Sequence, residues 1–184
     1  VFYCPEESAL RTFRDEYQLL PLGRKGEGVF KYLKELSQSE EGKLVLNEIN
    51  ENLSLLDWFD HIEVPATGLS NDYTVYIKHR YLTDTMSYFD QRSTNEGFLY
   101  LLFYFTLFIS KDTPAFFAID NIESSFNPKL CTKIIEVLQK LAVKHNKQVI
   151  LTTHNPFILD GLDLSDEDQR LFVVRRNDEG LVMY

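Results

Sequence analysis

The chain has 184 residues, 44% of them hydrophobic and 14% aromatic, so it can bury one sizeable core or one core with a smaller appendage. A net charge of -9 argues against a surface built entirely for nucleic acid. The two cysteines are far apart in the sequence, which implies neither a disulfide framework nor a zinc site. These properties predict a globular protein of a reducing, cytoplasmic compartment.

The longest apolar run, residues 98–109, is about half of the roughly 20 residues that span a bilayer. It predicts a buried helix and no membrane partner. The chain begins at Val1 without methionine, carries no signal-peptide pattern and ends inside an expected strand. We therefore expect it to be a fragment of a longer protein.

The first part of the chain predicts two amphipathic helices and a β-hairpin. Apolar residues recur at helical spacing over 29–36 and again over 46–56, which predicts an αα-hairpin. Residues 61–65 and 72–82 alternate with period two around the turn sequence ATGLSN, which predicts two paired strands. Polar residues from Asp84 onward then lead into the aromatic helix.

From Pro114 onward, strands and helices alternate. Residues 115–120 and 147–154 are apolar runs of strand length, and the helix predicted over 128–146 separates them. Such a βαβ unit predicts an α/β fold with a parallel sheet covered by helices. A hairpin over 170–184 is expected to follow, turning at the sequence NDEG.

We expect the change of pattern to mark a domain boundary. It divides the chain into a helical and β-hairpin insertion, residues 1–90, and a C-terminal α/β lobe, residues 91–184. No chemistry is predicted for the first part.

Polar residues follow both central strands. Asp120, Asn121 and Glu123 come after the first strand, and His154 follows the second. Because ligands bind beyond the carboxyl ends of strands in open parallel sheets, we expect these groups to be neighbours. A carboxylate at such a position typically holds the water shell of Mg²⁺, and a histidine beside it can contact a phosphate or an attacking water.

Each of these residues also has a purely structural interpretation. A lone aspartate after a strand is usually a turn residue, and Ser124, Ser125 or Asn127 before Pro128 could cap the next helix. The conjunction of two strand-end groups joined by one helix favours the functional interpretation.

Three motifs resemble those of a known family. FFAIDNIESSFNP, residues 116–128, resembles the Walker B and D-loop region of ABC-type ATPase heads, and VILTTHNP, residues 149–156, resembles their switch-histidine strand. STNEGFLYLLF, residues 93–103, stands where the signature motif begins a helix. The resemblance covers residues 90–176 and is greatest to the SMC-like and RecF-like branch and the OLD-type AAA ATPases, including ATPase subunits of phage-defence systems such as Septu and some retrons.

This resemblance implies the C-terminal lobe of a P-loop NTPase with ATP and Mg²⁺ as cofactors. Asp120 would hold the Mg²⁺ water shell, His154 would sense the γ-phosphate, and residues 124–128 would form the D-loop at a dimer interface. The signature, whose helix amides point at the nucleotide of a partner head, falls on three residues: Asn95, Glu96 and Gly97.

The implied partners are a second copy of the head and an effector protein or nucleic acid that the closing dimer controls. Antiviral defence is the biological role implied by the phage-defence relatives.

The sequence departs from the family pattern at two places. Asn121 stands where the family has its catalytic glutamate, and an amide cannot act as a general base. Glu123 would substitute for it if the loop let its carboxylate reach the water. No G-x-x-x-x-G-K-[ST] motif occurs, and the glycines of residues 21–28 are interpreted as a loop. We therefore expect the P-loop upstream or on another chain, and weak hydrolysis.

Two alternatives remain open. The first is a metal-dependent, Toprim-like nuclease that uses Asp120, Glu123 and His154, and it requires a further acid near a strand end. The acids of residues 160–168 are more typical of a solvated loop. The second is a non-catalytic interaction module, which Asn121 and the absent P-loop favour.

Overall fold

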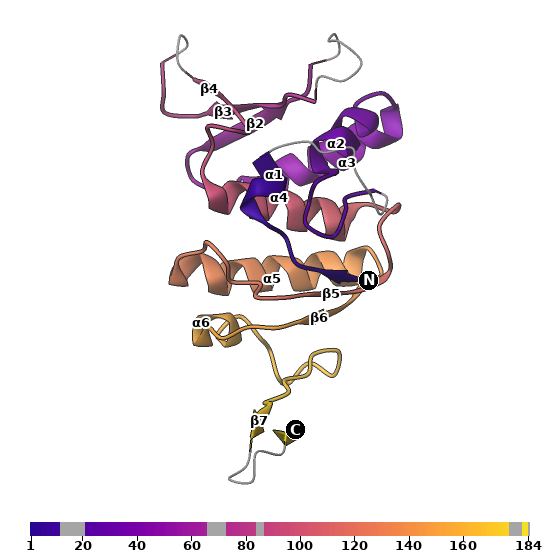
Figure 1. The fold of residues 1–184 in the computed structure, drawn as a ribbon, viewed down its shortest axis with the longest axis vertical. Coiled ribbons are helices and arrows are strands. Elements are labelled where there is room, and N and C mark those ends of the chain that lie inside the picture. The colour runs from indigo at the N-terminus through magenta and orange to yellow at the C-terminus, as the bar shows by residue number, and fades with distance from the viewer. Residues whose placement is uncertain (12–20, 66–72, 84–86, 177–181, 184) are drawn as a thin grey trace.

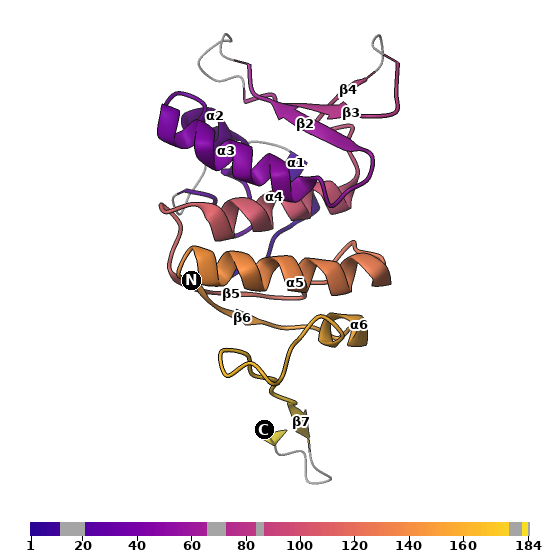
Figure 2. The same cartoon turned by 180° about the vertical axis from the view of Figure 1, so that it is seen from behind.

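A computed structural model describes residues 1–11, 21–65, 73–83, 87–176 and 182–183. The chain is layered along its long axis, with an antiparallel sheet at one end, helices next to it, and a parallel sheet with its helix beyond (Figures 1 and 2). The elements are β1 Phe2–Tyr3, α1 Glu7–Arg11, α2 Val29–Leu36, α3 Glu40–Leu53, β2 Phe59–Glu63, β3 Tyr76–His79, β4 Tyr88–Asp90, α4 Glu96–Ile109, β5 Phe116–Ile119, α5 Pro128–Lys144, β6 Gln148–Leu151, α6 Pro156–Leu159, β7 Arg175–Arg176 and β8 Val182–Met183.

The parallel sheet has the strand order β1-β5-β6. The pairing of β5 with β6, joined through α5, confirms the predicted βαβ unit and parallel sheet. Strand β1 was not predicted; Tyr3 lies opposite Ile119 and extends the sheet on the other side of β5. Ile119 in turn lies opposite Leu151, so all three strands end at one edge.

One face of this sheet is buried and the other is open. Tyr3 and Phe117 on the buried face are at most 3% exposed, whereas Phe2, Phe116 and Ile150 on the opposite face are each more than half exposed. Among the described residues, β6 pairs only with β5, so its outer edge is free. Parallel sheets normally have both faces covered, whereas only one face of this sheet is covered.

The first half of the chain forms the predicted helix pair and hairpin. Helix α3 begins at its cap Ser39, whose hydroxyl accepts from the Gly42 N–H at 3.0 Å. Strands β2 and β3 pair as predicted, β4 adds an unpredicted third strand, and the turn ATGLSN lies outside the described residues. The division into 1–90 and 91–184 remains a prediction; buried residues of both ranges belong to one hydrophobic cluster.

Two predicted elements need correction. The aromatic helix begins at Glu96 instead of Phe98, because Asn95 caps it. The C-terminal hairpin exists as β7 and β8, but residues 171–174, exposed and outside any strand, do not extend β7. The predicted NDEG turn lies outside the described residues.

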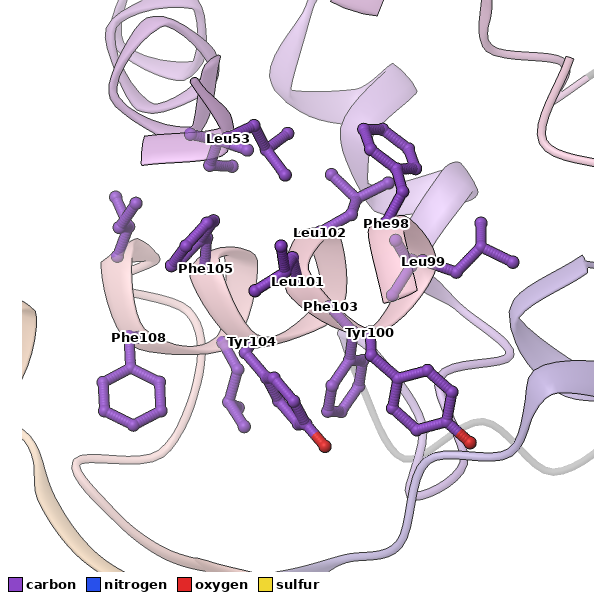
Figure 3. Packing of buried hydrophobic residues seen from close by; sticks show 14 of the residues in the cluster. Leu53, Phe98, Leu99, Tyr100, Leu101, Leu102, Phe103, Tyr104, Phe105 and Phe108 are labelled. Carbon is purple, nitrogen blue, oxygen red and sulfur yellow. The ribbon is translucent and has the colours of Figure 1, made fainter. Parts of the chain in front are cut away.

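Helix α4 is the central helix of the molecule. Every residue from Phe98 to Ile109 is buried, since α1, α3 and α5 all pack on this helix. Figure 3 shows its side chains pointing in all directions around the axis, with the Tyr100 and Tyr104 rings on the same side. A helix that is apolar all round is typical of a core position. Among the described residues, no helix is both long and apolar enough to cross a membrane.

The Tyr104 hydroxyl has no hydrogen-bond partner although the side chain is fully buried. Since an unpaired buried hydroxyl costs about 1–3 kcal/mol, Tyr104→Phe should raise the free energy of unfolding by about 1 kcal/mol in urea titrations. Tyr32→Phe is the matched control, because the Tyr32 hydroxyl donates to Asp112 at 2.8 Å and contacts Ser110, and this variant should be destabilised. Equal destabilisation of both variants would contradict the unpaired state of Tyr104.

Candidate functional site

The predicted strand-end residues meet at the carboxyl edge of the parallel sheet. Asp120 directly follows β5, and Thr152 directly follows β6. The Thr152 N–H donates to the Ile119 carbonyl at 3.0 Å, and the Asp120 N–H donates to the Tyr3 carbonyl at 3.1 Å, so the ladder continues past the strands. The Thr152 hydroxyl donates to Asp120 Oδ1 and thereby orients the carboxylate. We call Asp120, Asn121, Glu123, Thr152 and His154 the strand-end cluster.

Asn121 turns the chain away from the sheet. Its φ of 50° lies in the left-handed region, which asparagine tolerates better than most residues. Its N–H donates to Thr152 Oγ1 at 3.0 Å, and its carbonyl accepts from the Ser124 N–H at 3.0 Å. The family resemblance predicts a glutamate at this position. The structure has instead a turn residue whose backbone N–H and carbonyl bond to neighbouring residues.

Glu123 ties the loop after β5 to the loop after β6. Its Oε1 accepts from the His154 N–H at 2.9 Å, while Oε2 is buried without a hydrogen-bond partner. Burial by itself would raise the pKa of the Glu123 carboxyl, but the nearby Thr153 hydroxyl and the hydrogen bond from the His154 N–H outweigh it and hold this pKa below its ordinary value of 4.5. In this arrangement the carboxylate is an anchor turned into the protein, and a role as general base would require it to leave these contacts.

His154 is held through its backbone while its side chain is exposed. Asn155 then starts α6, because its side-chain oxygen accepts from the Phe157 N–H at 3.0 Å and Pro156 occupies the first helical turn. The imidazole thus stands at the sheet edge between an anchored loop and a capped helix.

The predicted signature residues lie against the predicted D-loop. The Asn95 side chain accepts from the Phe98 N–H at 2.8 Å and caps α4, with Glu96 in the first turn. A Cβ added at Gly97 would come within 3.2 Å of the Ser125 carbonyl oxygen, so glycine permits this close approach. The two motifs therefore contact each other within one subunit. The predicted D-loop is joined to the strand-end cluster directly, because it follows Glu123 in the chain.

The predicted D-loop, residues 124–128, forms a tight turn that leads into α5. Ser125 has a φ of 67°, and the Asn127 side chain accepts from the Leu130 N–H at 3.0 Å, so of the three predicted caps Asn127 is the one observed. The Phe126 ring packs edge-on against the Tyr100 and Tyr104 rings of α4, with centroids 6.5 Å and 6.2 Å apart. The predicted D-loop is therefore packed onto α4, the helix that the predicted signature begins.

The donor set at Asp120 suits a cation that binds mostly through phosphate and water. Within the described part of the chain, no three histidine, cysteine, aspartate or glutamate side chains gather closely enough to hold a metal ion. Mg²⁺ commonly binds through one or two carboxylates, several waters and substrate phosphates, which one oriented aspartate can serve. A nuclease site built on several acids receives no support from these residues.

Two contributions to the site were not predicted from the sequence. Thr152 is one of several polar residues after β6, and its hydroxyl contacts both Asp120 and the Asn121 N–H. Arg11, on α1, donates to carbonyl groups of the loop that precedes the signature, more than 80 residues later in the chain. A pattern of neighbouring residues carries no signal for such a long-range contact.

We expect Glu123→Ala to free the loop that carries His154. The variant removes the acceptor for the His154 N–H, and because a hydrogen bond to a charged group is worth about 1.5–3 kcal/mol, hydrogen exchange of this amide should accelerate about tenfold or more. Glu136→Ala, on the exposed side of α5, is the matched control. Unchanged protection of His154 would contradict the anchor.

The same contact predicts a pH dependence. Since the folded state lowers the pKa of Glu123, the anchor contributes stability above pH 4.5 and loses it as the pH falls through the lowered value. Protection of the His154 amide in the wild-type protein should therefore be constant near neutral pH and decline below pH 4.5, whereas Glu123→Ala should show no such decline.

Comparisons with known proteins agree with the architecture. A solved structure described as "Structural biochemistry of ATP-driven dimerization and DNA stimulated activation of SMC ATPases" superposes with a TM-score of 0.52 at 13% identity, covering 76% of this chain and 83% of that chain. At this identity the likeness shows the fold alone; together with the family match given below, it confirms the predicted α/β fold of the P-loop NTPase class. Among curated proteins, none matches. A family model described as "AAA domain, putative AbiEii toxin, Type IV TA system" matches residues 27–160, most of the chain, and the chain therefore belongs to this AAA domain family.

Proposed function

We propose that this chain is part of an ATP-binding ATPase head whose strand-end cluster serves a nucleotide with its Mg²⁺. The observation that carries the proposal is the hydrogen bond by which Thr152, at the end of β6, orients the Asp120 carboxylate at the end of β5. It is supported by membership in an AAA domain family and by the fold likeness to an SMC ATPase.

Each residue of the cluster has a separate task in this proposal. Asp120 accepts hydrogen bonds from the water shell of Mg²⁺, and Thr152 keeps the carboxylate in place for it. His154 presents its exposed imidazole to the terminal phosphate, while Glu123 fixes the backbone from which that imidazole projects. When bound, Mg²⁺ neutralises charge on the phosphates.

The phosphate cradle comes from outside this sequence, either upstream or on another chain, because the sequence contains no P-loop motif. The half-covered sheet supports this. Phe2, Phe116 and Ile150 form an exposed apolar face beside the free edge of β6, and a parallel sheet is normally covered there. The segment that carries the P-loop would cover this face and bring the phosphates to the strand-end cluster.

Asn121 favours slow turnover. An amide cannot accept the proton of an attacking water, and Glu123 is bonded into the protein. A long-lived ATP state follows, and it supports a second candidate function: a nucleotide-gated clamp that binds ATP without hydrolysing it.

The signature residues Asn95, Glu96 and Gly97 are proposed to close on nucleotide held by a second head. They open α4, whose N-terminal amides favour an anion. The SMC ATPase neighbour is described with ATP-driven dimerisation and DNA-stimulated activation. By analogy, a dimer of heads here would control an effector protein or nucleic acid in the cytoplasm. Antiviral defence is the role that the resemblance to ATPase subunits of phage-defence systems implies.

The test is ATP binding and turnover by the natural protein together with the segment that carries the P-loop. Wild type should bind ATP in the presence of Mg²⁺ and turn it over slowly. Asp120→Asn should weaken Mg²⁺-dependent binding about tenfold or more, because a neutral amide holds the ion's water shell less well. His154→Ala should mainly reduce turnover, and Asp168→Asn, in an exposed loop, should behave as wild type.

Three outcomes separate the candidates. Turnover that His154→Ala reduces supports the ATPase, and ATP binding without turnover supports the clamp. If wild type binds no nucleotide although the P-loop is present, the proposed function is wrong.

A further inference from the structure

The loop that precedes the signature is held by one distant arginine. Arg11 Nη1 donates to the carbonyl oxygens of Gln91, Arg92 and Thr94 at 3.3, 2.8 and 2.9 Å. Its Nε donates to Glu7 at 2.8 Å, one helical turn earlier on α1. Three backbone acceptors on one guanidinium nitrogen make a clamp, because a displacement of the loop would break several charge-assisted bonds together.

The N–H groups of the same loop are bound by a carboxylate. The Asp90 carboxylate accepts from the N–H groups of Arg92 and Ser93 at 3.0 and 2.9 Å, and from the Ser93 hydroxyl at 2.8 Å. These bonds, chiefly the one from the Ser93 hydroxyl, lower the pKa of Asp90. The Asp90 carboxylate therefore binds the N–H groups of this loop, and the Arg11 guanidinium binds its carbonyl groups.

The loop is also anchored at both of its ends. The Gln91 side chain accepts from the Val75 N–H at 3.1 Å, next to β3, and Gln91 is only 7% exposed. Thr94 is 6% exposed and is followed by Asn95, which caps α4. The segment before Arg11 contacts α4 as well, because the Pro5 carbonyl accepts from the Tyr100 hydroxyl at 3.3 Å.

We propose that Arg11 is a positioning residue for the signature: it holds residues 91–94 so that Asn95, Glu96 and Gly97 are presented in a fixed geometry to the nucleotide of a partner head. This rests on the proposed function. Preorganised groups bind more tightly because less conformational freedom is lost on association. The signature acts on the partner's nucleotide, so Arg11 should affect dimerisation and leave nucleotide binding by the single head intact.

The first arm of the test needs no nucleotide. Hydrogen exchange of the amides of residues 92–98 should accelerate about tenfold in Arg11→Ala, and Arg11→Lys should recover part of the protection because it keeps the charge. Arg170→Ala is the matched control, since Arg170 also donates to backbone carbonyls but lies in the loop after α6. Unchanged exchange in Arg11→Ala would overturn the clamp.

The second arm uses the complete head with its P-loop segment and a non-hydrolysable ATP analogue with Mg²⁺. In sedimentation experiments, Arg11→Ala should weaken nucleotide-driven dimerisation about tenfold, while nucleotide affinity at concentrations that keep the heads monomeric should change less than twofold. Arg11→Lys should restore part of the dimerisation. Unchanged dimerisation, or an equal loss of nucleotide affinity, would overturn the positioning role.

Failure of the proposed function would give a different experimental result. If the wild-type head binds no nucleotide, the proposed function is wrong, and with it the role of Arg11 toward a partner's nucleotide. The exchange arm then decides by itself whether Arg11 orders the loop. If wild type binds nucleotide but does not dimerise, only the partner-directed role of the signature and of Arg11 fails.

Discussion

The parallel pairing of β5 with β6 determines the geometry of the whole sheet edge. With Ile119 opposite Leu151, the next residue on each strand reaches the edge at the same level, and Thr152 can donate to the Asp120 carboxylate. A slip of one residue would turn the side chains of one strand to the other face of the sheet. The ladder continues beyond the strands, since the Ile122 N–H donates to the Thr152 carbonyl at 3.1 Å. Main-chain bonds therefore place the first residues of both loops, and the Glu123 carboxylate then ties the loop that carries His154 to the loop after β5.

Helix α4 connects the sheet edge to the rest of the core by packing. It is packed on every side, so it behaves as a rigid body whose orientation is set by the core. Its N-terminus carries Asn95 and Gly97, and the D-loop packs onto its aromatic side through Phe126. What the core does not determine is the course of the polar loop before the helix, and there Asp90 and Arg11 supply the missing constraint. At the N-terminus of α4, core packing thus fixes the helix, and polar bonds fix the loop that precedes it.

The sequence predicted the elements whose signals are local. The apolar runs of β5 and β6 and the amphipathic period of α5 identify a βαβ unit, and Asn127 before Pro128 is a good cap. Strand β1 was missed because two residues carry no period, and only pairing with β5 makes them a strand. The bonds of Arg11 and the inward turn of Glu123 depend on residues far away in the sequence. The sequence therefore predicted which residues lie at the strand ends, but it did not predict their hydrogen bonds or the direction of their side chains.

The inward turn of Glu123 changes how nucleotide energy would be used under the proposed function. A general base works best when its pKa is near the working pH and its carboxylate faces the water. Glu123 has a lowered pKa and is bonded to the His154 N–H, and Asn121 offers only an amide. Under the proposed function, a head with this arrangement would therefore hold ATP longer than a head with a free general base. The same contact that turns Glu123 inward would, under this proposal, also hold the backbone of His154 in place when its imidazole meets a terminal phosphate. Such a site is better suited to holding a closed state than to rapid cycling.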